Sequence, residues 1–238
     1  MYYVSCLRSK GVLIFMRNRV TCLWSVGLLC GIISAIARAQ ETKTQLEPGA
    51  FLPGPFQVLM MTGERAGKYH CPVCEYDLRP VVLVFLPDAD TDPKQAEFLQ
   101  RLDTLIGKYP AARLGGCAVF MNDGDYRKLI KQPIEENEKV KDLPLTSAIK
   151  HKEETETKIK KLAADANLKF LSLGLASHAD VAKYAPDKNQ ITVLFYLKQR
   201  VISTESFAKD KLTDAEMERM LQSIEAKCAE LTKSARMR

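Results

Sequence analysis

Residues 79–94 read RPVVLVFLPDADTDPK. Within them, residues 81–86 are all apolar, and such a run is typical of a strand that is buried on both faces, as in a parallel sheet. Pro87 ends this strand, because proline has no N–H for the next hydrogen bond of a ladder. Asp92 then has the position of a helix N-cap, and Pro93 follows it at the first helical position. The segment therefore predicts a buried strand that leads through an acidic loop into a helix.

Hydrophobic periodicity predicts further elements on both sides of this segment. Apolar residues recur at helical spacing in three stretches, and short apolar runs bounded by turn residues mark the strands. A charged region with weak patterning, at about 122–150, is predicted to be an insertion. The expected elements are strands at 56–61, 79–86, 117–121 and 168–173, a hairpin of 191–197 with 201–207, and helices at 92–108, 150–167 and 213–231.

The order of these elements predicts the fold class. Strands and helices alternate at first, which favours parallel strands joined by crossover helices, and the closing hairpin adds an antiparallel edge. We expect one α/β domain at 56–238, with three layers: a mixed central sheet and helices on both of its faces. Residues 40–55 are polar and then rich in proline and glycine, which predicts an extended linker ahead of the domain.

The first 39 residues have the features of a signal peptide. Two arginines follow Met16, an uncharged apolar run covers 23–36, and residues 37–39, Ala-Arg-Ala, form a small-x-small cleavage site. The functional start in this interpretation is Met16. We predict export to the periplasm or the extracellular space. The alternative is an uncleaved membrane anchor, although the apolar run is shorter than the ~20 residues that a spanning helix needs.

The charge of the chain gives no reason to expect a nucleic-acid partner. The chain has 35 Lys and Arg against 29 Asp and Glu, and five of the basic residues lie before Gln40. The part that remains after cleavage is therefore nearly neutral. Its sequence has no basic stripe interleaved with aromatic residues, which is the usual pattern of nucleic-acid binding. Membrane contact is expected only through the signal segment, if that segment is not cleaved.

Four cysteines remain after cleavage, and only Cys71 and Cys74 are close in sequence. In an exported protein, two cysteines separated by two residues can close a small disulfide ring or exchange disulfides with a substrate. His70 directly precedes the pair and could stabilise a thiolate when it is protonated. Cys117, at a strand start, and Cys228, on the apolar face of a helix, have the pattern of small core residues.

In its strand order and its Cys-x-x-Cys pair, the chain resembles the thioredoxin-like superfamily. The resemblance begins near Arg79 and extends to the last helix. It implies a thioredoxin fold and thiol–disulfide exchange with a protein thiol or disulfide, in which Cys71 attacks and Cys74 resolves the mixed disulfide. It implies neither a cofactor nor a metal.

Three features depart from the family pattern. The cysteine pair precedes the strand at 81–86, whereas the family's pair follows it, and residues 88–91, Asp-Ala-Asp-Thr, occupy that later position. Ile191 stands before Thr192 where the family has a cis-proline. Residues 87–94 are similar to the peroxiredoxin pattern Pro-x-x-x-Thr-x-x-Cys, but Lys94 replaces its cysteine. The missing thiol argues against peroxidase activity.

The residues leave three interpretations of the pair open. Thiol–disulfide exchange through Cys71 and Cys74 is the leading hypothesis. The alternative is a non-catalytic thioredoxin-like binding module, in which the disulfide stiffens the loop at 62–80. A metal site would need His70, the two cysteines and the distant His178, but zinc sites normally have a second ligand pair at a recognisable spacing, which this sequence lacks.

Overall fold

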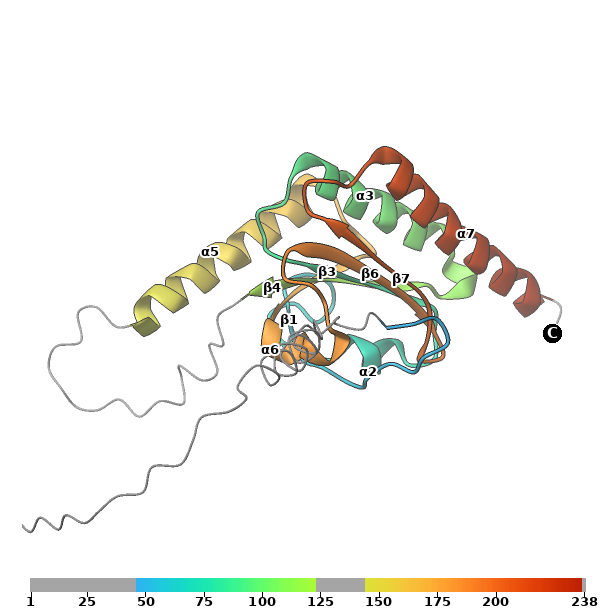
Figure 1. Cartoon of the computed structure of the whole chain (residues 1–238), viewed down its shortest axis with the longest axis horizontal. Coiled ribbons are helices and arrows are strands. Elements are labelled where there is room, and N and C mark those ends of the chain that lie inside the picture. The colour runs from blue at the N-terminus through green and yellow to red at the C-terminus, as the bar shows by residue number, and fades with distance from the viewer. Residues whose placement is uncertain (1–45, 123–143, 237–238) are drawn as a thin grey trace, which may run out of the picture. The chain divides into compact units, whose positions relative to one another are not determined.

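The structure, a computed structural model, describes residues 46–122 and 144–236. The predicted signal peptide at 1–39 and residues 123–143 of the predicted insertion lie outside the described residues. None of the described helices is long and apolar enough to cross a membrane. The described residues belong to one α/β unit, which Figure 1 shows.

In the described part of the chain, seven strands form a single mixed sheet in the order β2-β1-β5-β4-β3-β6-β7. The central strands β5, β4 and β3 are parallel, and β6 pairs antiparallel with β3. The predicted parallel crossovers and the closing β6–β7 hairpin are thus confirmed. A second antiparallel edge, made by β1 and β2, was not predicted. The strands are β1 (Val58–Met60), β2 (Tyr69–His70), β3 (Val81–Leu86), β4 (Gly115–Asn122), β5 (Ser172–Ser177), β6 (Gln190–Leu197) and β7 (Arg200–Ala208).

Helices cover both faces of the sheet (Figure 1). Buried side chains of α3, α5 and α7 pack on one face, and those of α2 and α6 pack on the other. This arrangement, with a β3–α3–β4 crossover and a hairpin before the last helix, is that of the thioredoxin-like fold, and it confirms the predicted fold class. The helices are α2 (Pro72–Tyr76), α3 (Pro93–Lys108), α5 (Pro144–Asp165), α6 (His178–Val181) and α7 (Asp214–Arg236), with 3-10 turns η1 (Pro110–Ala112) and η3 (Ala182–Tyr184).

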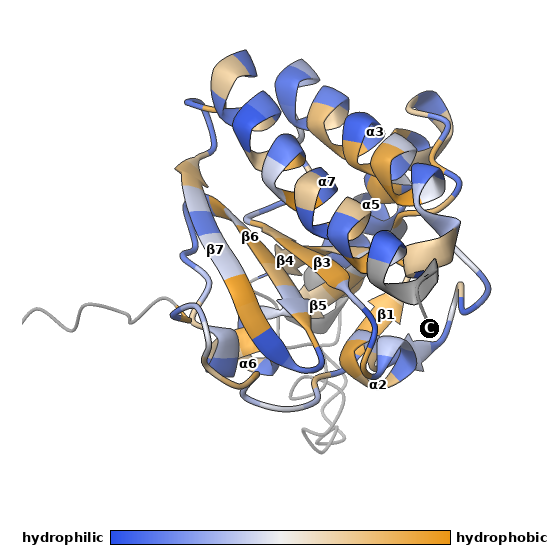
Figure 2. Cartoon of the chain, turned by 90° about the vertical axis from the view of Figure 1, so that its right-hand side faces the viewer, coloured by the Kyte–Doolittle hydropathy of each residue, from blue (hydrophilic) through white to orange (hydrophobic). Residues whose placement is uncertain are grey.

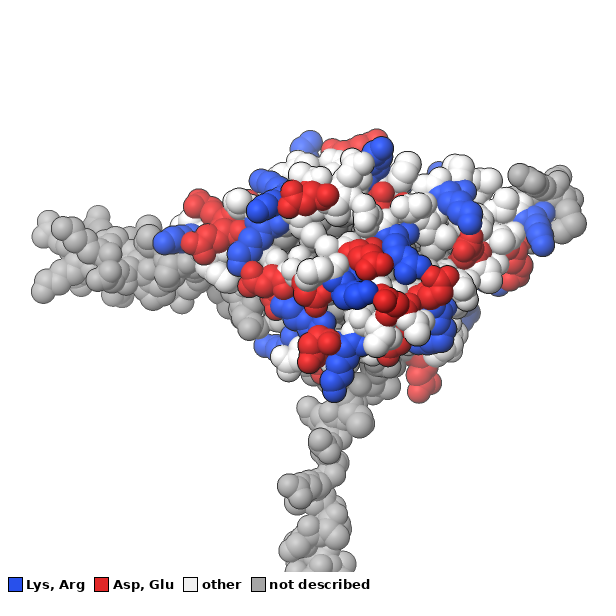
Figure 3. Space-filling model, turned by 90° about the horizontal axis from the view of Figure 1, so that it is seen from above, with Lys and Arg blue, Asp and Glu red and all other residues white. Residues whose placement is uncertain are grey.

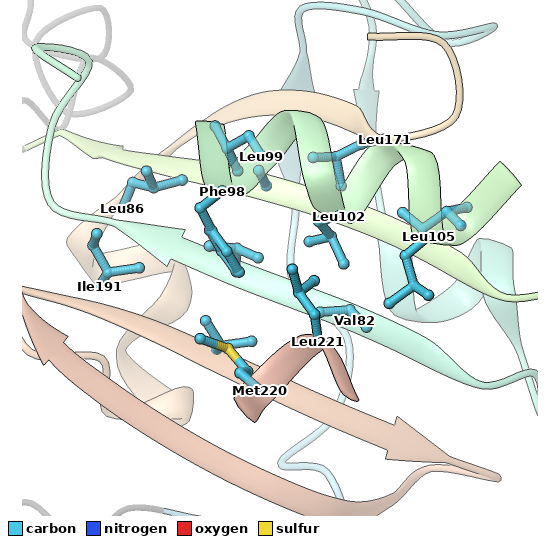
Figure 4. Close-up of a cluster of buried hydrophobic side chains, with 14 of the residues drawn as sticks. Val82, Leu86, Phe98, Leu99, Leu102, Leu105, Leu171, Ile191, Met220 and Leu221 are labelled. Carbon is cyan, nitrogen blue, oxygen red and sulfur yellow. The ribbon is translucent and has the colours of Figure 1, made fainter. Parts of the chain in front are cut away.

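The side chains of β3 alternate between two hydrophobic cores, because successive residues of a strand point to opposite faces. The even-numbered residues belong to the core under α3 and α7, and the odd-numbered residues belong to the core beside α2. In the first core, Phe98 and Leu102 of α3 and Met220 and Leu221 of α7 pack with Val82 and Leu86 of the sheet (Figure 4). Figure 2 shows the same pattern as apolar strands flanked by helices with polar outer faces. Each such buried side chain contributes roughly 1.5–3 kcal/mol.

Local capping fixes where α3 and α7 begin. The carboxylate of Asp92 accepts the backbone N–H of Gln95 at 2.8 Å, which confirms the predicted N-cap. The three-residue spacing of Thr213 and Glu216 in the sequence also predicts a capping box ahead of α7, and the structure confirms it. Ion pairs then join the two helices along their outer faces, where Lys and Arg alternate with Asp and Glu (Figure 3). The pairs are Lys94–Asp214, Arg101–Glu218 and Lys108–Glu225.

The strand predicted at 168–173 is β5, and it begins later, at Ser172. The reason is Asp103 of α3, which is 6% exposed. One oxygen of its carboxylate accepts the backbone N–H groups of residues 169, 170 and 171, at 2.7–2.9 Å. Because these donors are directed to a carboxylate, they cannot take part in a strand ladder.

Two other boundaries differ from the prediction. α5 begins at Pro144, so the end of the predicted insertion at 122–150 is helical. Gly115 and Gly116, which precede the strand predicted at 117–121, belong to β4 itself. The absent side chains leave room for neighbours: a Cβ at Gly115 would lie 2.5 Å from the Tyr76 ring, and one at Gly116 would lie 2.3 Å from Ile106.

The end of the predicted linker contacts the domain. Residues 46–52 run beside β7, where Val201 exchanges backbone hydrogen bonds with Gly49 and Ala50 at 2.8 and 2.9 Å. The guanidinium of Arg200 lies 3.8 Å from the centre of the Phe51 ring. This segment therefore satisfies part of an otherwise unpaired sheet edge.

Candidate functional site

The cysteine pair lies on α2, a short helix that the sequence did not predict. Cys71 is its N-cap and follows directly after β2, and Pro72 occupies the first helical position. The backbone N–H of Cys74 donates a hydrogen bond to the sulfur of Cys71 at 3.1 Å. The order Cys-Pro could have indicated this start, because proline at the first helical position is a common start signal.

Cys71 and Cys74 form a disulfide, with their Cα atoms 5.3 Å apart. Their environments differ. Cys71 is 6% exposed and belongs to the core beside α2, together with Val73 and Cys117. Cys74 is exposed to solvent. One end of the disulfide is therefore buried under the protein's own side chains, and the other end is open to solvent.

Tyr76 anchors α2 to the sheet. Its hydroxyl donates to the carbonyl oxygen of Gly116 in β4, at 2.9 Å, and its ring lies against Gly115. Burial raises the pKa of this phenol, so it stays protonated and remains a donor. Arg79 holds the same, C-terminal end of α2 by donating to the carbonyl oxygens of Glu75 and Tyr76, at 2.9 and 3.2 Å. The disulfide is thus carried by a short helix whose C-terminal end is fixed to the sheet and to the segment that follows it.

His70, the predicted modulator of the thiol, contacts a carboxylate. Its Nε2 lies 2.9 Å from Oε2 of Glu75, and both side chains are partly exposed. A protonated imidazole here is held by Glu75 as an ion pair. The role of His70 toward the sulfurs remains a prediction.

The loop after β3 has no sulfur, and its charged groups form ion pairs or a helix cap. Asp88 binds Lys209 at 2.7 Å. Asp90 binds Lys158 at 2.5 Å, and this hydrogen bond lowers the pKa of Asp90. Asp92 caps α3, and Lys94, which replaces the cysteine of the peroxiredoxin pattern, pairs with Asp214. These side chains stabilise the loop and the start of α3.

The cysteine pair and this acidic loop lie at opposite ends of β3. α2 precedes the strand and the loop follows it, as the sequence predicted. A six-residue strand spans about 20 Å at ~3.3 Å per residue. The carboxylates of the loop are therefore too far away to act on the disulfide directly.

The two other described cysteines are buried in the core. Cys117 in β4 and Cys228 in α7 are both fully buried. Burial raises the pKa of Cys117 to about 12 and that of Cys228 to about 11. Because the thiolate is the reactive form, neither is suited to exchange near neutral pH. In the described part of the chain, no group of three His, Cys, Asp or Glu side chains could hold a metal ion.

Comparisons with known proteins give structural neighbours of low identity. No family model and no curated protein matches the sequence. A peroxidoxin, BcpB, of Mycobacterium tuberculosis is 16% identical over 76% of this chain and 98% of its own, with a TM-score of 0.47. A secreted disulfide oxidoreductase of the same organism, homologous to E. coli DsbE, is 10% identical over 72% and 95%, with a TM-score of 0.45. The thioredoxin domain of a thiol-disulfide oxidoreductase from Bacteroides vulgatus is 8% identical over 75% and 98%, with a TM-score of 0.46. At such identity, no residue role follows from these likenesses.

Proposed function

We propose that this chain is an exported thiol–disulfide oxidoreductase of the thioredoxin-like fold, which acts through Cys71 and Cys74 on a protein thiol or disulfide. The observation that carries the proposal is the disulfide between them, which has one solvent-exposed member, Cys74. Exchange requires a sulfur that a partner thiolate can reach, and Cys74 meets that requirement.

The surroundings of the pair support this proposal. Cys117 and Cys228 are buried, so among the described cysteines a partner thiol can reach only the 71–74 disulfide. The contacts of Tyr76 and Arg79 fix the C-terminal end of α2, and a helix held in place favours keeping the two sulfurs within bonding reach after reduction. The N–H of Cys74 is in place to stabilise a thiolate at Cys71 when the disulfide opens.

The rival function is a non-catalytic binding module in which the disulfide is a structural staple. The burial of Cys71 favours it, since structural bridges are often covered. The two functions differ in what loss of the bridge does. A staple mainly affects the stability of the fold, whereas an exchange site mainly affects turnover.

Reduction of insulin by dithiothreitol, followed as turbidity, tests the proposal. The wild-type full chain is expected to accelerate the reaction, and Cys71→Ser and Cys74→Ser are expected to return it to the uncatalysed rate. Cys228→Ala is the matched control, because it removes a cysteine outside the pair and should keep wild-type turnover. Equal, background-level rates for the wild type and both serine variants would refute the proposed oxidoreductase activity.

Export is proposed from the sequence of the first 39 residues. If it is correct, the protein recovered outside the cytosol begins at Gln40, which N-terminal sequencing would identify. A chain that retains residues 23–36 and stays with the membrane fraction would support the uncleaved anchor instead.

A further inference from the structure

We infer that Cys74, and not Cys71, is the cysteine that bonds to the partner in the mixed disulfide, and that Cys71 is the resolving cysteine. The inference rests on the proposed function and deepens it. It reverses the order that the family resemblance implies, in which the first cysteine of the pair attacks. The two sulfurs differ in their access to solvent and in their hydrogen bonding.

Solvent exposure favours Cys74 as the cysteine that a partner thiolate attacks. A thiolate attacks a disulfide along the S–S axis, from the side opposite the leaving sulfur, so the attacked sulfur must be open to solvent. Cys71 is 6% exposed and is packed in the core beside α2. The two residues between the cysteines, Pro72 and Val73, are buried as well, whereas Cys74 is exposed. A partner thiolate therefore reaches the sulfur of Cys74.

The hydrogen bond to the sulfur of Cys71 also favours attack at Cys74. When Cys74 is attacked, the electron pair of the broken bond moves to the sulfur of Cys71. That sulfur already accepts the N–H of Cys74 at 3.1 Å, and a hydrogen bond to an anion stabilises it. A more stable thiolate is a better leaving group. Attack at Cys71 would instead make the Cys74 thiolate the leaving group. Among the described contacts, no backbone N–H donates a hydrogen bond to the Cys74 sulfur, whereas the Cys71 sulfur accepts one.

The exchange can be written with its atoms and electrons balanced. A thiolate of a substrate dithiol bonds to the sulfur of Cys74, the Cys71–Cys74 bond breaks, and Cys71 leaves as a thiolate. The second substrate thiol, deprotonated, then attacks the substrate sulfur of the mixed disulfide and releases Cys74. The substrate loses two electrons and two protons, and the enzyme pair gains them. In the opposite direction, Cys74 attacks a substrate disulfide and Cys71 then displaces the substrate from Cys74.

Alkylation of the reduced wild-type protein tests the order without any substitution. The protein is reduced, freed of reductant and pulsed with limiting iodoacetamide, and fragment-ion mass spectrometry locates the label. Cys74 is expected to react at least about tenfold faster than Cys71, because the reagent reaches exposed Cys74, whereas the core covers Cys71 and shields even a stabilised thiolate there. Equal labelling, or faster labelling of Cys71, would overturn the inference.

Variants that lack one cysteine of the pair give a second test. With oxidised glutathione, Cys71→Ser should gain one glutathione at Cys74 at least about tenfold faster than Cys74→Ser gains one at Cys71. The reverse order would also overturn the inference. The insulin assay separates the two proposals: wild-type turnover with trapping at Cys71 refutes only the order, whereas an inactive wild type refutes the proposed function.

Discussion

Opening the Cys71–Cys74 disulfide should change stability only modestly. The bridge joins residues three apart, so it closes a loop of four residues. In the chain-entropy model, a loop of this size restricts the unfolded chain by about 6 cal/mol/K, or about 2 kcal/mol at 25 °C. For a domain of this size, such a loss lowers the melting temperature by roughly 4–8 °C. A bridge this short is therefore a weak staple, whichever function it has.

Urea unfolding followed by circular dichroism measures this loss. The oxidised wild type is compared with Cys74→Ser, because Cys74 is exposed and its substitution leaves no cavity. Wild-type protein in dithiothreitol is the matched control, since it loses the bridge without a substitution, and the two should agree. A loss of more than about 4 kcal/mol in both samples would exceed the entropic contribution and refute this reasoning. Such a large loss would favour the alternative function, in which the disulfide is a structural staple.

Three further predictions concern the scaffold. Asp103→Ala should lower the free energy of unfolding by about 3–5 kcal/mol in urea, because it leaves the three N–H groups of residues 169–171 without their acceptor; a loss under about 1 kcal/mol would contradict this. Tyr76→Phe should lower the free energy of unfolding by about 1 kcal/mol in the same measurement, because it removes only the hydrogen bond to the carbonyl oxygen of Gly116. An unchanged free energy of unfolding would mean that this hydrogen bond does not anchor α2. Because burial raises the pKa of Cys117 to about 12, above the ~8.5 of an unfolded thiol, the native state keeps a proton that the unfolded state has lost. The free energy of unfolding should therefore fall as the pH rises from about 9 towards 12, and unfolding curves that do not change over this range would contradict it.

The sequence predicts those elements whose signals are local. The apolar run of β3, the cap at Asp92 and the capping box at Thr213 each depend on residues within five positions of one another, and the structure confirms them. α2 has only five residues, too few to show a helical period, so only the proline after Cys71 indicated it.

The elements that were misplaced depend on distant contacts. The start of β5 is set by Asp103, more than sixty positions earlier in the chain. Residues 46–52 look like a linker by composition, but β7 supplies their hydrogen-bond partners. The different exposure of Cys71 and Cys74 could not be predicted either, because the core to which Cys71 belongs is completed by strands far along the chain, such as β4 and β6.

The reduction potential of the Cys71–Cys74 pair tests the account most directly. It is measured by thiol trapping of the wild-type protein equilibrated in glutathione redox buffers. An exchange site should have a potential between about −270 and −120 mV, in the range of thiol–disulfide oxidoreductases. A potential below about −300 mV, typical of structural bridges, would contradict the account.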